Sequence, residues 1–461
     1  MKTVFATVLV LLGGCCVTAL GNSPGIGGAD SARTVVPLLA SAGSHEEQRE
    51  PGGGQALQLL PSGFLAPDLW HRSSLTGSWN GVRDDWRDGG VRFDLRYTAD
   101  NIMNLGGGVT SGSSYLHSVE ASAEIDAAKL LDLTGMSFDV RVLHHTGPEL
   151  AGSVGAVQSP SGIAGRKTTR LYEALIRQRF MRDRVLVAVG LYDIATEFSV
   201  IDAGRIFLNR SFEVGKELSQ TAGGGLALFP NSAPAIRVWL KPGRAWSFQF
   251  AGAEARPQTY DDGSSATSSL DASRGAFVIG EVTYSWFDNS AHSTGGGKYT
   301  LGAWLYTASF EEVYPSVQNP SLRSTANNGV YMIAEQNILS HRETAGGLSL
   351  FARVGWANSR INRFDRNIVF GAFYTGLLPG REHDALGVAV AHVSNGTEFL
   401  ERMSQARLPY ANAEIAIEFT YKMKVAPWLT IQPDLQRIIH PGARSDIGNA
   451  TVFGTRLQCV L

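Results

Sequence analysis

The sequence predicts an all-β protein: a transmembrane, antiparallel, up-and-down β-barrel of about sixteen strands, preceded by a short helix and a flexible N-terminal region. From Val91 onward, segments of about ten residues alternate apolar with polar or small side chains, and clusters of Gly, Asn, Pro and Asp separate them. Tight and long connections both occur between these segments, which is typical of barrels in outer membranes. After the N-terminus there is no run of about 18 uncharged apolar residues, which excludes a helical membrane protein.

The first residues have the layout of a secretory signal peptide. Lys2 precedes an apolar run over residues 4–13, and small residues follow that run. We therefore expect residues 1–21 to be a signal peptide that is cleaved after Gly21. A lipoprotein signal, with lipidation at Cys15, is the alternative.

Two further segments precede the predicted barrel. Residues 22–74 are rich in Gly, Ser, Pro and charge and have little to bury, so they predict a flexible periplasmic region. Residues 75–90 predict a short helix that is capped by Asn80 and ends at a glycine pair. The barrel itself is expected over residues 91–461.

Composition excludes several classes of protein. The formal net charge is −2 and no Lys/Arg block occurs, so nothing indicates a nucleic-acid partner. Of three cysteines, only Cys459 lies outside the signal region, so we expect neither an internal disulfide framework nor a Cys-x-x-Cys metal site.

The connections between the candidate strands differ in length. Tight turns are predicted at 181–183, 243–245 and 426–428. Long loops are predicted at 147–169, 194–234, 256–274 and 309–328. The candidate strands begin near Val91, Tyr115, Met136, Arg170, Arg184, Ala235, Trp246, Gly275, Gly297, Gly329, Gly347, Arg366, Asp384, Tyr410, Trp428 and Asn449.

The first of these segments, VRFDLRYTAD, shows why a pore is expected. Successive strand side chains point to opposite faces, so Phe93 and Leu95 share an apolar face while Asp94 and Arg96 share a charged face. If the apolar face contacts lipid, the charged face lines a water-filled lumen. A periplasmic or secreted soluble β protein is the alternative.

The same alternation predicts a set of lumen-facing side chains with both signs of charge, plus amides. A mixture of this kind does not form a ring of one sign, so it suits a neutral polar solute better than an ion. Cations would donate to solute hydroxyls, carboxylates would accept from them, and aromatic rings would stack on sugar rings. For each residue the alternative is simple wall lining, hydrogen-bonded to its neighbours. The set is Asp94, Arg96, Glu120, Glu124, Asp139, Arg141, Glu173, Arg177, Arg237, Trp239, Gln249, Glu281, Arg353, Glu414, Glu418, Gln432, Asp434 and Gln436.

Several blocks of the chain resemble the carbohydrate-selective porins of the OprB family. The strongest are GSWNGVRDDWRDGGVRFDLRYTADNIMNLGGG (77–108) and GLYDIATEFSVIDAGRIFLNRSF (190–212), with KVAPWLTIQPDLQRIIHPGA (424–443) near the end. The resemblance implies a sixteen-stranded barrel in the outer membrane of a Gram-negative cell. It also implies passive, cofactor-free diffusion of mono- and small oligosaccharides of the glucose type into the periplasm.

The family narrows its channel with inward-folded loops, and the 194–234 connection is our candidate for that role. Within it, Asn209 and Arg210 lie beside Phe207 and Phe212, which either face sugar or hold the loop to the wall. The residues expected to contact the sugar are Asp94, Arg96, Glu120, Arg141, Glu173, Arg177, Asn209, Arg210, Arg237, Trp239, Trp304, Arg353, Glu414, Glu418 and Asp434.

Signals for catalysis are weak. His392 and Ser394 share a strand face, but no serine-hydrolase signature, H-E-x-x-H motif or calcium loop accompanies them. We expect no catalytic residue, metal site or cofactor, and the partners to be small carbohydrates and outer-membrane lipid. A general porin and a surface-binding, adhesin-like barrel remain alternatives, and the sequence is compatible with a monomer or a homotrimer.

Overall fold

The computed structural model describes residues 69–147, 151–165, 167–221, 228–255, 275–287, 296–312, 324–339 and 346–461. The predicted signal peptide, the possible lipidation site at Cys15 and nearly all of the 22–74 region lie outside these residues.

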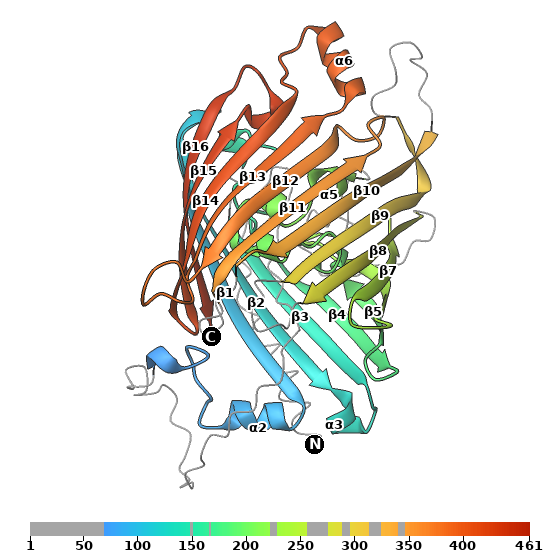
Figure 1. Ribbon diagram of the computed structural model, residues 1–461, viewed down its shortest axis with the longest axis vertical. Helices are drawn as coiled ribbons and strands as arrows, with labels where there is room; N and C mark the ends of the chain where they lie inside the picture. The colour runs from blue at the N-terminus through green and yellow to red at the C-terminus, as the bar shows by residue number, and fades with distance from the viewer. Residues whose placement is uncertain are drawn as a thin grey trace, which may run out of the picture.

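Sixteen antiparallel strands form one closed barrel, in which each strand pairs with its neighbours in the chain and β1 closes onto β16 (Figure 1). This confirms the predicted fold class. The largest displacement from a predicted start is at β10, which begins at Ser324 and not near Gly329. The strands are β1 Val91–Gly108, β2 Gly112–Asp126, β3 Met136–Thr146, β4 Thr168–Phe180, β5 Val185–Tyr192, β6 Ala233–Leu240, β7 Trp246–Glu254, β8 Ala276–Phe287, β9 Gly296–Glu311, β10 Ser324–Asn337, β11 Gly347–Ala357, β12 Phe364–Thr375, β13 Ala385–Asn395, β14 Ala413–Ala426, β15 Leu429–Ile439 and β16 Gly448–Val460.

The helices in the described part of the chain are short, and none of them is long and apolar enough to cross a bilayer. In α2 the cap differs from the prediction: Gly81 precedes the helix with φ 92°, and Asn80 lies one position earlier with φ 57°. The helix ends at Gly89 as predicted. The helices are η1 Leu69–His71, α2 Val82–Asp88, α3 Ala127–Leu131, α4 Ala151–Val154, η2 Ile194–Thr196, η3 Ala203–Ile206, η4 Arg210–Phe212, α5 Lys216–Ser219, α6 Thr397–Ala406 and η7 Pro441–Ala443.

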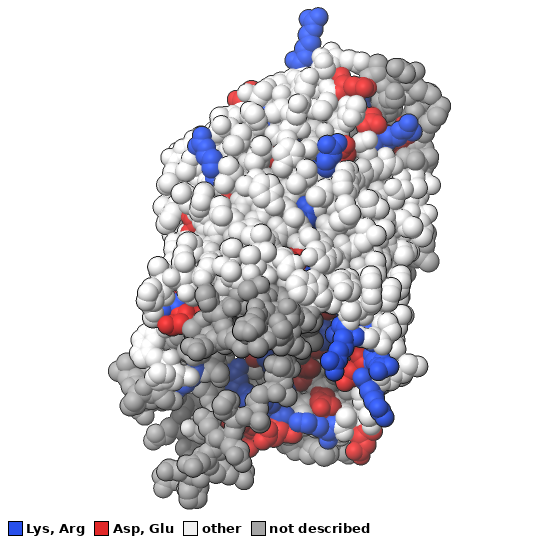
Figure 2. Space-filling model, in the orientation of Figure 1, with Lys and Arg blue, Asp and Glu red and all other residues white. Residues whose placement is uncertain are grey.

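The outer face of the barrel is apolar. Phe250 and Leu301 are each 53 % exposed on that face, which is the exposure expected of side chains that contact lipid. Near the short-turn end, Trp246, Tyr284 and Tyr299 lie side by side on three neighbouring strands, as in the aromatic girdle of outer-membrane barrels. On the side in view, a largely uncharged band separates two ends where charged residues gather (Figure 2).

The seam between β1 and β16 is held from the inside. Arg456 donates two hydrogen bonds of 2.7 Å to the buried carboxylate of Asp100, which lies directly opposite on β1. Below the barrel, Arg83 of α2 donates to the backbone oxygens of Leu461 and Phe93. The helix before the barrel is therefore fastened to both strands of the seam.

Candidate functional site

Two long connections fold into the barrel instead of away from it. The β3–β4 loop, described over 151–165, carries α4, and the β5–β6 loop, described over 193–221, carries η2, η3, η4 and α5. Figure 1 shows the green β5–β6 segment inside the ring of strands. The loop predicted to narrow the channel therefore does lie in the lumen, and a second loop accompanies it.

Apolar packing seats the β5–β6 loop against one side of the wall. Phe207 and Phe212 of the loop are buried and stack around Phe351 of β11, with ring centroids 5.7 and 6.4 Å from it. Trp304 of β9 is 2 % exposed in the same cluster. Of the two interpretations of the loop phenylalanines, the structure supports the one in which they hold the loop to the wall.

Glycines on the lumen face of the wall make room for this packing. A Cβ atom added to Gly387 of β13 would lie 2.5 Å from Ile206 Cδ1 and 2.9 Å from Phe207 Cζ. Added to Gly355 of β11, it would lie 2.1 Å from a carboxyl oxygen of Glu217. These strands can therefore carry only glycine where the loop approaches them most closely.

Wall carboxylates bind the backbone of the β5–β6 loop. Glu418 of β14 is fully buried and accepts from two consecutive loop amides, at 2.5 Å from Leu208 N and 2.9 Å from Asn209 N. A buried amide left without an acceptor costs about 1–3 kcal/mol, so each such carboxyl group fixes the loop by satisfying one or two of its amides. The carboxylate and amide pairs of this kind are Glu173 with Asp193, Glu281 with Ser199, Glu335 with Ala203, and Glu418 with Leu208 and Asn209.

Wall donors bind the carbonyl groups of the same loop. The guanidinium of Arg353, fully buried on β11, donates to the backbone oxygens of Ser199, Ser211 and Glu213. Gln432 of β15 donates to Ile206 O at 2.5 Å. The loop backbone, which has little regular structure of its own, is satisfied by the wall.

Glu414 gives the β3–β4 loop the same support. Its carboxylate accepts from Val157 N and Gln158 N at 2.8 Å each, and from Gly442 N at 2.6 Å. The two inward loops are also joined to each other, because Gly162 N donates to Leu208 O at 2.6 Å. Together the loops form one body fastened to the wall.

The space left beside this body is a cavity of about 320 Å³ at the short-turn end of the lumen. One side is the wall of β14, β15, β16 and β1, and the other side is the β5–β6 loop. Its lining includes four cations (Arg96, Arg205, Lys422 and Arg456), the polar side chains of Thr196, Thr430, Gln432 and Gln458, the carboxylate of Glu213, and the ring of Trp428.

Comparison with known proteins identifies the family of the chain. The family profile described as carbohydrate-selective porin, OprB family, matches residues 110–461. The chain belongs to this family. It is 26 % identical over 417 residues to Porin B of Pseudomonas aeruginosa, covering 84 % of this chain and 91 % of that protein.

Solved structures agree with the fold. The high-pH structure of Pseudomonas putida OprB superposes with a TM-score of 0.78 at 26 % identity, covering 85 % of this chain and 99 % of that one. The low-pH structure of the same protein gives 0.56 at 20 % identity, with the same coverage, and supports the fold alone. The protein is a carbohydrate-selective porin of the outer membrane, a multi-pass β-barrel, and its family and fold indicate a channel and not an enzyme.

Most residues expected to contact sugar in the porin contact other parts of the protein. Glu173, Arg353, Glu414 and Glu418 hold the loops, Asn209 is fully buried within the loop, and Trp304 is covered by it. Buried in this way, these six cannot present a surface to a solute in this structure. Sequence alternation placed the wall residues on the correct face but could not show that a loop covers that face.

Other expected residues form ion pairs along the wall. Arg141 lies 3.5 Å from Glu120 and 3.2 Å from Glu173, and Arg177 lies 2.5 Å from Asp139. Asp94 pairs with Arg92 at 2.9 Å, Arg237 with Glu197 at 3.1 Å, and Asp434 accepts from Gln436 at 2.8 Å. Trp239 is half-buried on the lumen face beside Lys241, and Arg210 is half-buried in η4.

Of the residues expected to contact sugar, Arg96 is the one in the lining of the cavity. Sequence reasoning missed Lys422, Gln458 and Trp428. Lys422 had a usable signal, since it lies on the same strand face as Glu418, four positions along.

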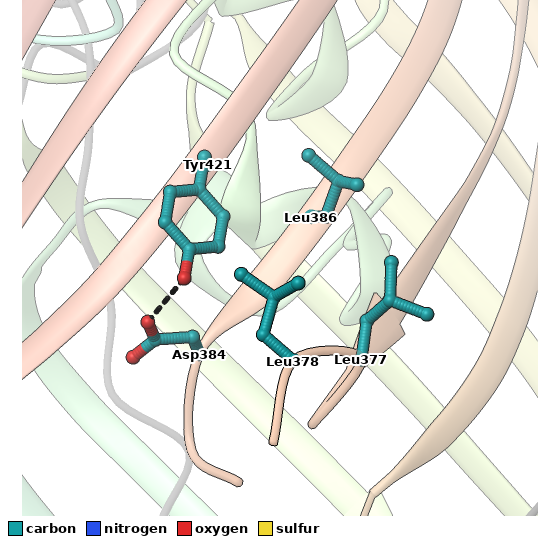
Figure 3. Close-up of a pocket in the computed structure, with 5 residues that line it drawn as sticks. All are labelled: Leu377, Leu378, Asp384, Leu386 and Tyr421. Carbon is teal, nitrogen blue, oxygen red and sulfur yellow. Dashed lines mark hydrogen bonds between the residues drawn. The ribbon is translucent and has the colours of Figure 1, made fainter. Parts of the chain in front are cut away.

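A smaller pocket of about 190 Å³ lies on the outside, at the turn between β12 and β13 (Figure 3). Three leucines line it, and Tyr421 donates to Asp384 at 2.5 Å. Asp384 also accepts from Lys424 N and from Arg381. These contacts brace the turn, so the pocket is a feature of the barrel edge and not of the channel.

Proposed function

We propose that this porin conducts mono- and small oligosaccharides of the glucose type by passive diffusion into the periplasm. The observation that carries the proposal is the cavity between the inward loops and the β14–β1 wall. A volume of about 320 Å³ corresponds to roughly ten waters, which fits a small polyol.

The polar lining offers partners for sugar hydroxyls. Thr430 and Gln458, half-buried and directly opposite each other on β15 and β16, can replace part of the hydration of a sugar. Trp428 lines the short-turn end of the cavity, where it is held by stacking on Trp70 with ring centroids 6.1 Å apart. Several weak contacts let a solute enter and leave again.

In this proposal the sugar diffuses through an open channel and binds briefly in the cavity on its way, without a gating step. Sugar enters from the long-loop end, passes the loops, occupies the cavity and leaves at the short-turn end into the periplasm. In this proposal the half-buried wall residues Glu120, Arg141 and Arg177, with Asp94 and Trp239, line the route on either side of the loops.

Single-channel conductance in a planar bilayer tests the proposal. Glucose, a disaccharide and a non-sugar osmolyte such as glycerol are added in turn to the purified full-length protein. Partial, saturable closure by glucose is the expected result, with a weaker effect from the disaccharide. Conductance that responds equally to all three would leave a general porin, and absence of channels from the folded barrel would contradict the pore.

A further inference from the structure

We infer that the cavity at the short-turn end binds carboxylated sugars, such as uronic and aldonic acids, more tightly than neutral sugars, through Arg96 and Lys422. This inference rests on the proposed passage of sugars and adds the charge of the preferred solute. It departs from the neutral solute that the mixed charges of the sequence suggested.

The first step is that the loops cover five acidic side chains of the wall. Glu414 and Glu418 are fully buried beneath the loops, and Glu173, Glu281 and Glu335 are between 4 and 8 % exposed there. Their oxygens accept from loop amides, as described above. These five carboxyl groups are therefore hydrogen-bonded to loop amides and are covered by protein, so a solute does not meet them.

The second step concerns the cations that stay in the cavity lining. Arg456 is balanced by Asp100 at 2.7 Å, and Arg205 by Asp202 at 3.2 Å. Within the part of the chain that the structure describes, Arg96 and Lys422 have no ion-pair partner.

The carboxylates nearest to Arg96 and Lys422 are directed to other cations. Glu120 lies opposite Arg96 in the β1–β2 register, but its carboxylate is directed to Arg141 at 3.5 Å. The charged groups that act on Lys422 are the cations Arg96, Lys424 and Arg456, and their mutual repulsion is relieved when an anionic solute binds between them. The single carboxylate in the lining, Glu213, is close to Arg456.

The third step is that this charge lies where a sugar would pause. Lys422 projects from β14 and Arg96 from β1, so they border the polar pair Thr430 and Gln458 on the two strands between them. A hexose held by Thr430 and Gln458 would meet one cation at either side. A carboxylate on the sugar would gain Coulomb attraction that a neutral hydroxymethyl group cannot gain, and low-dielectric walls concentrate that field.

The test compares three pyranoses of matched size and different charge: glucuronate, glucose and glucosamine. Their binding to the reconstituted full-length porin is measured by blockage of single-channel conductance at about 0.1 M salt, where the Debye length is about 10 Å. We expect glucuronate to bind about fivefold more tightly than glucose, because one solvent-exposed charge contact raises affinity by about that factor. Glucosamine, which is positively charged, should bind most weakly.

Substitutions at Arg96 and Lys422 test whether these two cations cause the preference for glucuronate. In the double variant Lys422→Gln with Arg96→Gln, the ratio of glucuronate to glucose affinity should fall to about one while glucose still blocks the channel. Lys241→Gln, in the turn after β6 and outside the cavity lining, removes one positive charge near the same end and should leave the ratio unchanged.

Raising the salt to about 1 M provides a test that needs no variant, because screening should abolish the preference for glucuronate in the unmodified porin. Equal affinity for glucose and glucuronate, or a preference that survives high salt and the double variant, would overturn the inference. If glucose fails to block the channel, the proposed function fails instead, and the order of glucuronate against glucosamine still decides the charge preference.

Discussion

Glu418 is a residue whose role changes between sequence and structure. In the sequence it is one of several acids on the lumen face of a strand, suited to accept from a sugar hydroxyl. In the structure its two oxygens accept from Leu208 N and Asn209 N, 210 and 209 positions away in the chain. No local pattern contains that information, so alternation could predict the face of Glu418 but not its partner.

Replacing Glu418 by Ala should release the middle of the β5–β6 loop while the barrel stays folded. The change leaves two buried amides without an acceptor, at a cost of about 1–3 kcal/mol each, and the loop then moves away from the wall. We expect larger and noisier single-channel conductance. Glu124→Ala, which removes a lumen-face acid that makes no hydrogen bond to either loop in the described residues, should leave conductance close to its original value.

The buried carboxyl group of Glu217, in α5, should make the stability of the folded protein depend on pH. Burial raises the pKa of Glu217 from 4.5 to about 7, against the opposing attraction of Arg353. An acid that binds its proton more tightly in the folded state stabilises the fold at low pH, and that contribution is lost between about pH 4.5 and about pH 7. Thermal unfolding in detergent should show stability falling across this window.

The variant Glu217→Gln should lose this pH dependence and gain stability relative to the original chain at pH 8. Glu401→Gln, on the exposed side of α6, serves as the control because the same change is made on the surface. Equal slopes of melting temperature against pH in the original chain and in Glu217→Gln would contradict this role of Glu217.

At the scale of elements, the strands were predictable and the loops were not. Strand alternation is a signal within ten residues, and β1, β3, β7 and β11 begin at the residues that the pattern predicts. The inward loops depend on contacts with strands far along the chain, such as that of Gln158 N with Glu414, 256 positions away. The long 194–234 connection indicated that something fills the lumen, but the seating of the loop arises from the closed barrel.

A substitution at Gly387 of β13 tests how the β5–β6 loop packs against the wall. Gly387→Val would place methyl groups where Ile206 and Phe207 now lie, and overpacking of this kind costs about 1–3 kcal/mol. Because the loop is less regular than the strand, we expect the loop to move and the conductance to rise, with an unchanged β-sheet signal in circular dichroism. Gly252→Val, on the outer face of β7 where no atom lies within 4 Å of an added Cβ, should have no such effect.

At the scale of the whole molecule, the barrel is a protein with its apolar surface on the outside and its polar groups within. Leu305 of β9 is 46 % exposed on the outer face near the middle of its strand. Leu305→Arg should lower the free energy of unfolding of the barrel in vesicles by about 2–4 kcal/mol, measured by urea titration, because a charge at this depth contacts lipid. Leu305→Met keeps the surface apolar and should fold almost as well as the original chain, and equal stability of the two variants would contradict the assignment of this face.

The seam between β1 and β16 has a consequence for how such a barrel assembles. Arg456 and Asp100, which join its two strands, are 356 positions apart, so this contact closes the longest loop of any strand pair in the ring. Until the other fourteen strands are in place, β1 has a free edge whose amides and carbonyls can pair with a foreign strand. Assembly of the ring therefore depends on protecting its first strand for the whole time that the rest is being made, and a barrel interrupted late remains as prone to wrong pairing as one interrupted early.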